Sequence, residues 1–477
     1  MRQFLYILVL LLTPLFLFGQ KVTFSEDFTI RQDIAYYMID DMEGDMVLFR
    51  DIPRERKIHV LDDNMLTIST TPISFEFKNP TILDVVKARN DEFSVIYTAR
   101  ERGIKYLRIE NFDKNGILKD TLTVEDYSNV LDIPRYRAEK SDDESKILLY
   151  DVNADRSITA MMIDIEKLEV LWKNKFDNLN IRQSFQINQF IVDNDGSFCL
   201  TLLKSNSSIK RKEARFEIYI YNESTNMMDP LKVPLEGNLS VSSMFKFDKL
   251  NNCLVGAGLY AKKNTIKAQG TYYLNVPLDN KENYILSYNR FDDKFMRDFL
   301  QKKNVNDNSG INSTEIRDII LRQDGGVLLL GEKIETKGRQ NINQAVDFGP
   351  GNRALRADFY YDQIFVTSIH PDGKNHWTNI FQKKQYSFDD GGIYSSYFTF
   401  VGKKGVRLLF NDEIRSQSTI SEFTISGTGQ YKRRAIINTS GTDIKLRVRD
   451  ALQISANEII IPSQFRNKLK MVKFNFQ

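Results

Sequence analysis

The chain has 477 residues, of which 42% are hydrophobic, 12% aromatic and 27% charged, so it can bury a large core and is neither disordered nor fibrous. Its 66 Lys and Arg against 63 Asp and Glu give a formal charge of +3, which removes any general argument for binding nucleic acid or an anionic membrane. With 3 His and 2 Cys, a multi-His metal centre, a Cys-rich zinc module and a disulfide-stapled scaffold are disfavoured. Cys199 and Cys253 lie in separate apolar runs and are interpreted as buried thiols, with a disulfide left open.

The N-terminus is typical of a secretory signal peptide over residues 1–19. A short basic start at Arg2 precedes an apolar run over residues 4–18, which contains Pro14. The run is shorter than the ~20 residues that a helix needs to cross a membrane, so we expect cleavage after Gly19, with an uncleaved anchor as the alternative. Later segments offer no apolar span of membrane length. The sequence therefore predicts an exported protein with no transmembrane segment after cleavage, located in the periplasm, at the cell surface or outside the cell.

From about residue 35 one pattern recurs: an apolar run, a tight polar turn, a second apolar run, a longer excursion and two further runs. The second run opens eight times, over residues 41–49, 90–97, 141–150, 193–203, 249–256, 323–331, 402–410 and 455–461. Intervals that begin near 50 residues and stretch to about 80 fall in the range of four-stranded propeller blades with insertions. The pattern predicts a β-propeller.

Period-two alternation supports the strand assignment, as in residues 215–221, where Phe216, Ile218 and Ile220 share one face. Helical spacing of apolar residues occurs over 291–302, which predicts one short helix.

The last copy of the repeat is too short to form a whole blade. Residues 450–477 have room for about three strands of ~5–6 residues each. Residues 22–30 could supply the fourth strand and close the ring, which would remove exposed sheet edges. The sequence therefore predicts an all-β domain over residues 20–477: a single closed propeller of eight four-stranded blades, with seven as the alternative, in which an N-terminal strand completes the last blade.

Loop lengths differ between the two ends of the predicted ring. If the strands of a blade are named A to D, the A/B and C/D turns lie at one end, and the B/C loops and D-to-A connections lie at the other. The A/B and C/D turns are short and rich in Asp, Asn and Gly. Long segments fall at the other end, as B/C loops over 204–214, 261–282 and 332–358 and as D-to-A connections over 296–314 and 382–395. We call this end the long-loop face and expect the binding site there, since variable loops on a rigid scaffold usually carry function.

Two of these segments supply the candidate ligand-binding residues. The segment 332–358 and the residues after it contain Arg353, Arg356, Tyr360 and Tyr361, and these residue types contribute most to recognition surfaces. A solvent-covered loop is the alternative interpretation.

The segment 382–395 contributes Asp389, Asp390 and Tyr394 to the candidate set. Two acids could serve glycosidic chemistry, but the distance between carboxyl groups decides this and sequence does not give it. Turn acids are the alternative that we favour.

Trp172 and Trp377 each follow a C/D turn by a few residues. This spacing resembles the tryptophan-docking repeats of quinoprotein-type propellers, in which the indole packs between neighbouring blades. The two cysteines do not form the vicinal pair of a quinone site, so the resemblance implies blade packing, and we predict no cofactor and no metal.

The C-terminal third also resembles uncharacterised exported propeller-like proteins of Bacteroidota-type bacteria. The residues that carry the resemblance are Asp324, Tyr360-Tyr361-Asp362, His370-Pro371-Asp372-Gly373, Trp377, Asp389-Asp390-Gly391-Gly392 and Phe410-Asn411-Asp412. The resemblance implies export and a propeller fold, and it brings no assigned catalytic residues.

Two functions are compatible with these observations. We expect a non-enzymatic binding or scaffold propeller that engages a protein or glycan at the cell envelope through its long-loop face. The alternative is a propeller hydrolase or lyase that acts on polysaccharide with acids near Asp389 and Asp390. A central pocket with two carboxylates at catalytic separation would favour the enzyme, and a broad, open loop face would favour the binder.

Overall fold

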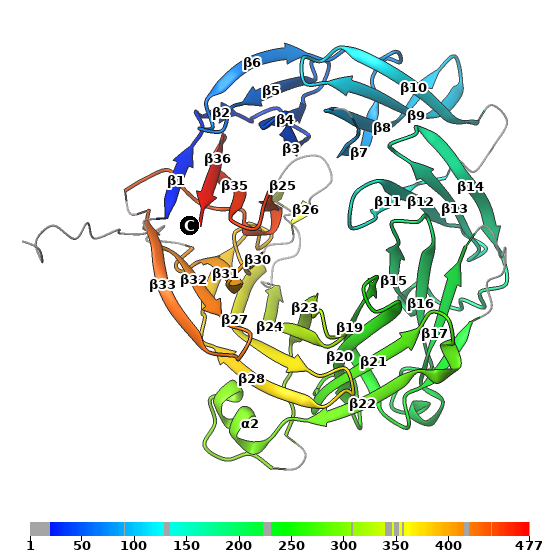
Figure 1. The fold of residues 1–477 in the computed structure, drawn as a ribbon, viewed down its shortest axis with the longest axis vertical. Helices are drawn as coiled ribbons and strands as arrows, with labels where there is room; N and C mark the ends of the chain where they lie inside the picture. The colour runs from blue at the N-terminus through cyan, green and yellow to red at the C-terminus, as the bar shows by residue number, and fades with distance from the viewer. Residues whose placement is uncertain are drawn as a thin grey trace, which may run out of the picture.

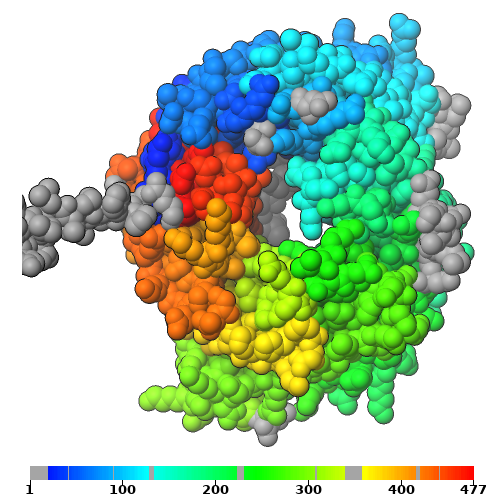
Figure 2. Space-filling view, viewed as in Figure 1, coloured from blue at the N-terminus to red at the C-terminus, as the bar shows by residue number. Residues whose placement is uncertain are grey.

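Eight antiparallel sheets stand as blades around a central opening (Figures 1 and 2). The computed structural model describes residues 20–476 except 90, 128–133, 223–229, 307–308, 339–345, 348–352, 355–356, 415–418 and 440, so the predicted signal peptide lies outside the described residues. Each of the eight sheets contains the four strands of a blade, which confirms the predicted all-β propeller and excludes the seven-bladed alternative.

The first four blades follow one another along the chain, and each runs from an inner to an outer strand (Figure 1). Blade 1 contains β3 (Ala35–Met42), β4 (Asp45–Asp51), β5 (Lys57–Leu61) and β6 (Thr67–Pro72). Blade 2 contains β7 (Thr81–Lys87), β8 (Glu92–Glu101), β9 (Ile104–Asp113) and β10 (Leu118–Tyr127). Blade 3 contains β11 (Arg137–Lys140), β12 (Lys146–Val152), β13 (Ile158–Asp164) and β14 (Glu169–Phe176). Blade 4 contains β15 (Ile187–Val192), β16 (Phe198–Lys204), β17 (Arg215–Tyr221) and β18 (Leu231–Pro234).

The remaining blades carry the additions to the repeat. Blade 5 contains β19 (Leu239–Asp248), β20 (Cys253–Ala261), β21 (Gly270–Pro277) and β22 (Ile285–Arg290). Blade 6 contains β23 (Thr314–Leu321), β24 (Val327–Gly338), β27 (Ala357–Ile369) and β28 (Asn375–Phe381), with β29 (Gln385–Phe388) also paired to β27. Blade 7 contains β30 (Phe398–Gly402), β31 (Gly405–Asn411), β32 (Thr419–Ile425) and β33 (Tyr431–Asn438). Blade 8 contains β34 (Leu452–Gln453), β35 (Glu458–Phe465) and β36 (Lys468–Asn475) with β1 (Lys21–Phe24) and β2 (Phe28–Thr29).

A few short elements lie between the strands. The hairpin β25 (Val346–Asp347) and β26 (Arg353–Ala354) belongs to the B/C loop of blade 6. The helix α2 (Asp293–Leu300) confirms the predicted helix and connects blade 5 to blade 6. Four 3₁₀ turns are η1 (Ser184–Gln186), η2 (Arg211–Glu213), η3 (Lys281–Asn283) and η4 (Val448–Asp450). None of the helices in the described part of the chain has the length and apolar character that crossing a membrane requires.

The N-terminal strand closes the ring as predicted. β1 pairs antiparallel with the end of β36, from Lys21 opposite Asn475 to Phe24 opposite Val472. β2 continues along the same strand, with Phe28 opposite Leu469. The outer edge of β36 is therefore covered by the first strands of the chain, and blade 8 unites the two ends of the sequence.

The apolar core is divided into eight clusters, each between two neighbouring blades. In β4, Met46 and Leu48 pack toward blade 8, whereas Val47 and Phe49 pack toward blade 2. Alternate side chains of a strand point to opposite faces, and here both faces are covered by another sheet. This arrangement explains why the second run of each repeat is almost continuously apolar.

Two predicted B/C loops are wrong in extent. The segment 332–358 begins inside β24, which ends at Gly338, and ends inside β27, which begins at Ala357. The segment 261–282 contains β21, the third strand of blade 5, so the B/C loop covers 262–269 alone. Tyr272 and Tyr273 are both 0% exposed and belong to the clusters on opposite sides of the blade. A strand that is buried on both faces shows no polar alternation, and that is why the sequence pattern did not reveal it.

Both tryptophans pack between blades, as the docking interpretation predicted. Trp172 Nε1 donates a hydrogen bond of 3.2 Å to the carbonyl of Gly196 in blade 4, and its ring stacks on Phe198 with centroids 5.5 Å apart. Trp377 Nε1 donates to the carbonyl of Gly427 in blade 7 at 3.2 Å. The two cysteines are buried free thiols, which confirms the unpaired interpretation.

Candidate functional site

The connection between blades 7 and 8 carries three cations in alternation with core residues. Leu446 and Val448 are 0% exposed, whereas Lys445 and Arg447 are half-buried and Arg449 is exposed. Because the apolar residues of this stretch are fixed in the core, the cations between them face away from it.

The same stretch extends the inner strand of blade 8 toward the long-loop face. Leu446 forms an antiparallel bridge with Ser463 of β35, and the Arg447 amide donates to the carbonyl of Pro462 at 2.7 Å. Backbone hydrogen bonds to a central strand therefore hold Lys445 and Arg447, and Arg449 follows directly in the 3₁₀ turn η4.

Each cation lies over the ring of a tyrosine from a different part of the chain. The distances to the ring centres are 3.9 Å from Lys445 Nζ to Tyr394, 5.3 Å from Arg447 Cζ to Tyr36 and 4.8 Å from Arg449 Cζ to Tyr361. We call these six residues the tyrosine–cation row. The tyrosines come from the connection after blade 6, from β3 and from β27, so the row joins blades 6, 7, 8 and 1. Cation–π contacts contribute about 0.5–2 kcal/mol each, depending on exposure.

The charges of the row are unequally compensated. Arg447 Nε forms an ion pair of 2.6 Å with Asp450 Oδ2, and the Tyr36 hydroxyl donates to the same oxygen at 2.9 Å. Arg449, in contrast, has no carboxylate within ion-pair distance in the described part of the chain, and it keeps its donors exposed on the Tyr361 ring.

Burial keeps Tyr36 and Tyr394 of the row neutral. It raises the pKa of Tyr394 to about 12 and the pKa of Tyr36 well above its ordinary value. Burial also lowers the pKa of the Lys445 ammonium, which the nearby Asp390 carboxylate partly offsets. Tyr36 and Tyr394 therefore present neutral aromatic faces to the cations that lie on them.

A buried polar network supports Tyr361 from behind. Lys383 Nζ donates to the Tyr361 carbonyl at 2.9 Å and to Gln385 Oε1 at 2.7 Å, and it lies 2.7 Å from Glu332 Oε1. Ser396 Oγ donates to Glu332 Oε2 at 2.5 Å. The side chains of Lys383 and Glu332 are both 0% exposed, so the backbone under the row is held by a fully desolvated ion pair.

The predicted candidates separate into two groups. Tyr361 and Tyr394 belong to the row, and Asp390 lies close enough to Lys445 to affect its pKa. Tyr360 points to the other face of β27, where its ring packs 5.1 Å from that of Tyr386. Arg353 lies in β26, whose side chains are not described, and Arg356 lies outside the described residues.

Both candidate acids accept hydrogen bonds from the backbone, Asp390 within its turn and Asp389 from the start of β27. Asp389 Oδ1 accepts from the Ala357 amide at 3.1 Å, and Asp390 Oδ1 accepts from the Gly392 amide and from Ser387 Oγ, each at 2.8 Å. Neither carboxylate lines the surface hollows of about 990, 590 and 510 Å³ that the structure forms elsewhere. Within the described ranges, no three His, Cys, Asp or Glu side chains gather in a way that could hold a metal ion.

Four residues of the row were not predicted: Tyr36, Lys445, Arg447 and Arg449. The alternation of cations with apolar residues over 445–449 is visible in the sequence and would have indicated a charged strand face. The tyrosines that pair with these cations could not be found in this way, because each pair is separated by more than 50 residues along the chain. The pair Tyr394 and Lys445 has the shortest separation.

Comparison with known proteins adds no assignment. No protein-family model matches the chain, and no curated protein matches it. Among solved structures, it is similar to Sqt1 of Saccharomyces cerevisiae, with 9% identity, coverage of 94% of this chain and 98% of that one, and a TM-score of 0.43. The polysaccharide lyase Uly1 has 9% identity, coverage of 84% and 91%, and a TM-score of 0.40. A protein of unknown function from Bacteroides caccae has 14% identity, coverage of 68% and 90%, and a TM-score of 0.27. At such low similarity these structures carry no argument about function, and the fold rests on the eight blades themselves.

Proposed function

We propose that the protein is an exported, non-enzymatic binding propeller that recognises a protein or glycan at the cell envelope through its long-loop face. The observation that carries the proposal is the exposed Arg449 guanidinium, which lies 4.8 Å above the centre of the buried Tyr361 ring without a carboxylate partner among the described residues. Arg and Tyr in a fixed arrangement are typical of the residues that contribute most binding energy at recognition surfaces.

The rigidity of the row supports binding further. Tyr361 and Tyr394 are 6% and 9% exposed, and the backbone of Arg447 is bonded to β35. A ligand would therefore meet side chains that are already ordered, and little conformational entropy would be lost on association. The open donors of Arg449 could bind a carboxylate, a carbonyl or a sugar hydroxyl.

The enzymatic alternative has less support. A hydrolase or lyase would require two carboxylates that face a shared substrate pocket at a defined separation. Asp390 instead accepts a hydrogen bond from the Gly392 amide of its own turn, and Asp389 accepts one from the Ala357 amide at the start of β27. Backbone hydrogen bonding accounts for both acids, and this favours the binding proposal.

Export is part of the proposal and has its own test. Expression of the full chain in a bacterium with a Sec pathway should yield a periplasmic or secreted protein whose first residue is Gln20, as read by mass spectrometry of the N-terminal peptide. A cytoplasmic product that retains Met1 would contradict the export step.

The binding proposal is tested with the row itself. The mature protein, R449Q and K445Q/R449Q would be used to capture material from the envelope of the native cell, and each recovered protein or glycan would then be titrated in purified form. We expect the double variant to bind at least about tenfold more weakly, because exposed hot-spot side chains contribute ~1–2 kcal/mol each. The control K78Q/K232Q, which removes two exposed lysines elsewhere, should bind like the wild type. Equal affinities of all variants, or polysaccharide cleavage that is lost in D389N/D390N, would contradict the proposal.

A further inference from the structure

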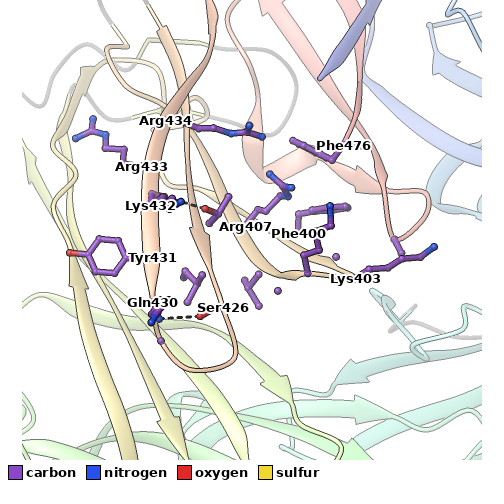
Figure 3. A pocket seen from close by; sticks show the side chains of 18 of the residues that line it. Phe400, Lys403, Arg407, Ser426, Gln430, Tyr431, Lys432, Arg433, Arg434 and Phe476 are labelled. Atoms are coloured by element: carbon purple, nitrogen blue, oxygen red, sulfur yellow. Dashed lines mark hydrogen bonds between the residues drawn. The ribbon is translucent and has the colours of Figure 1, made fainter. Parts of the chain in front are cut away.

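The largest of the three surface hollows mentioned above lies at the end of the ring opposite the long-loop face. It has a volume of about 990 Å³ and is bounded by the A/B and C/D turns of blade 7, by residues 456–457 of blade 8 and by Phe476 (Figure 3). We call it the basic wedge, because blades 7 and 8 form its two walls and cations line it.

The wall from blade 7 presents cations across three strands. Register places Arg407 of β31 opposite Thr424 of β32, and Thr424 opposite Lys432 of β33. These side chains share one face of the sheet, and Arg434 follows two residues after Lys432 on the same face. Figure 3 shows Arg407 and Arg434 pointing toward Phe476. Lys403 and Lys404 of the A/B turn also line the wedge, and no Asp or Glu among the described residues does.

The two arginines are fixed by a carboxylate behind them. Glu422 is 0% exposed and accepts from Arg407 Nη1 at 2.8 and 3.1 Å, and it also accepts from Arg434 Nε. The Arg407 guanidinium also lies 4.5 Å from the centre of the Phe476 ring. Lys403, Lys404 and Lys432 have no ion-pair partner among the described residues. The wedge therefore combines two ordered guanidinium groups, which share one negative charge, with three uncompensated lysines.

The spacing of these charges favours a chain-like anion over a compact one. Adjacent strands lie about 4.8 Å apart, so Arg407 and Lys432 are separated by about 10 Å across two strands, and Lys432 and Arg434 by roughly 6–7 Å along one. The three unpaired lysines come from the A/B turn and from the outer strand, so an extended anion can contact more of them at once than a compact one. The cations stand on the faces of paired strands, and β33, which carries Lys432 and Arg434, is the outer strand of the blade, so the test below includes a peptide probe that could add to its edge.

From these observations we propose that the basic wedge binds an anionic oligosaccharide, whose carboxylate or sulfate groups contact Lys403, Lys404 and Lys432. Arg407, Arg434 and the ring of Phe476 form the back of this site. The site is separate from the tyrosine–cation row and independent of the function proposed for it, because the two lie at opposite ends of the ring.

The test is a calorimetric titration of the mature protein with four probes of similar length: an oligogalacturonate, a heparin-derived oligosaccharide, a neutral maltooligosaccharide and a poly-glutamate peptide. We expect one or both anionic oligosaccharides to bind, and the two arms distinguish carboxylate from sulfate. Affinity should fall as salt rises from about 50 to about 300 mM, since exposed charges are screened. The maltooligosaccharide should not bind.

A matched pair of variants assigns the binding to the wedge. K403Q/K404Q/K432Q should weaken binding roughly tenfold, because three exposed ion contacts each contribute a factor of about two to five. K78Q/K232Q/K267Q removes the same charge from exposed lysines of other blades and should leave affinity unchanged. Circular dichroism and thermal melting would verify that both variants fold. Equal loss in the two variants, no binding of either anionic oligosaccharide, or tighter binding of poly-glutamate would overturn the proposal.

Discussion

The buried ion pair under the tyrosine–cation row makes a quantitative prediction about stability. Lys383→Met removes the ammonium that contacts Glu332 at 2.7 Å and the Tyr361 carbonyl at 2.9 Å. The Glu332 carboxylate is 0% exposed and would keep the 2.5 Å hydrogen bond from Ser396 and the half-buried Arg317, whose Nε lies 3.8 Å away. A buried charge that loses its close, fully buried partner costs about 3–5 kcal/mol of unfolding free energy. Glu332→Gln should cost a similar amount, because it leaves the buried ammonium without its counter-charge.

The double variant E332L/K383M separates this explanation from a simple loss of contacts. Replacing both charges with apolar side chains removes the uncompensated charge, so we expect the double variant to be more stable than either single variant and within about 2 kcal/mol of the wild type. The assay is guanidinium unfolding of all four proteins, followed by far-ultraviolet circular dichroism and tryptophan fluorescence. Additive losses, with the double variant the least stable, would refute the reasoning.

Three further predictions concern the blade interfaces. Burial and the nearby Arg50 charge lower the pKa of His59 from 6.5 to about 4. Between these two pH values the unfolded chain binds a proton at His59 and the folded chain does not. The free energy of unfolding should therefore fall by roughly 2–3 kcal/mol from pH 6.5 to pH 4. Melting curves of His59→Gln over this range should show a smaller slope, and an unchanged slope would contradict the assignment. Trp172→Ala removes an indole that is 7% exposed between blades 3 and 4, and it should lower the free energy of chemical unfolding by ~3–5 kcal/mol. Trp377 is half-buried, so Trp377→Ala should lower it clearly less. Equal losses in the two variants would contradict the docking geometry. Deleting residues 20–30 should uncover the edge of β36 and produce aggregates in light scattering, whereas a monodisperse truncated protein would show that ring closure is dispensable.

The fold could be predicted from sequence because its signals are local and repeated. Each blade presents an apolar second strand beside a tight polar turn, and the eight copies of this pattern can be counted along the chain. Closure by the N-terminal strand followed from the length of the last copy alone. The strand β21 was missed because Tyr272 and Tyr273 are buried against two different blades, so local alternation carried no signal there.

The candidate site was predictable only in part because its contacts span the ring. Composition pointed to Tyr361 and Tyr394, but nothing in their local sequence indicates that cations from residues 445–449 cover their rings. The basic wedge was missed for the same reason. Its lysines and arginines lie in two short runs about 30 residues apart, and antiparallel register brings them onto one face. Long-range pairing of this kind is a property of the tertiary fold and leaves no periodic trace in the sequence.

The division of the core into eight separate clusters has a mechanical consequence. Each cluster connects two adjacent blades, so every blade is held by its two neighbours. The interface with the least apolar packing should therefore be the first to open. Among the described residues, the cluster between blades 8 and 1 has the fewest buried apolar side chains, 8 against 10 to 17 in the others. The same junction contains His59, the ion pair of Arg50 with Asp33 and the short strand β2. Under pulling force or at low pH, the interface between blades 8 and 1 should therefore separate first, and blade 1 should unfold while distant blades remain folded.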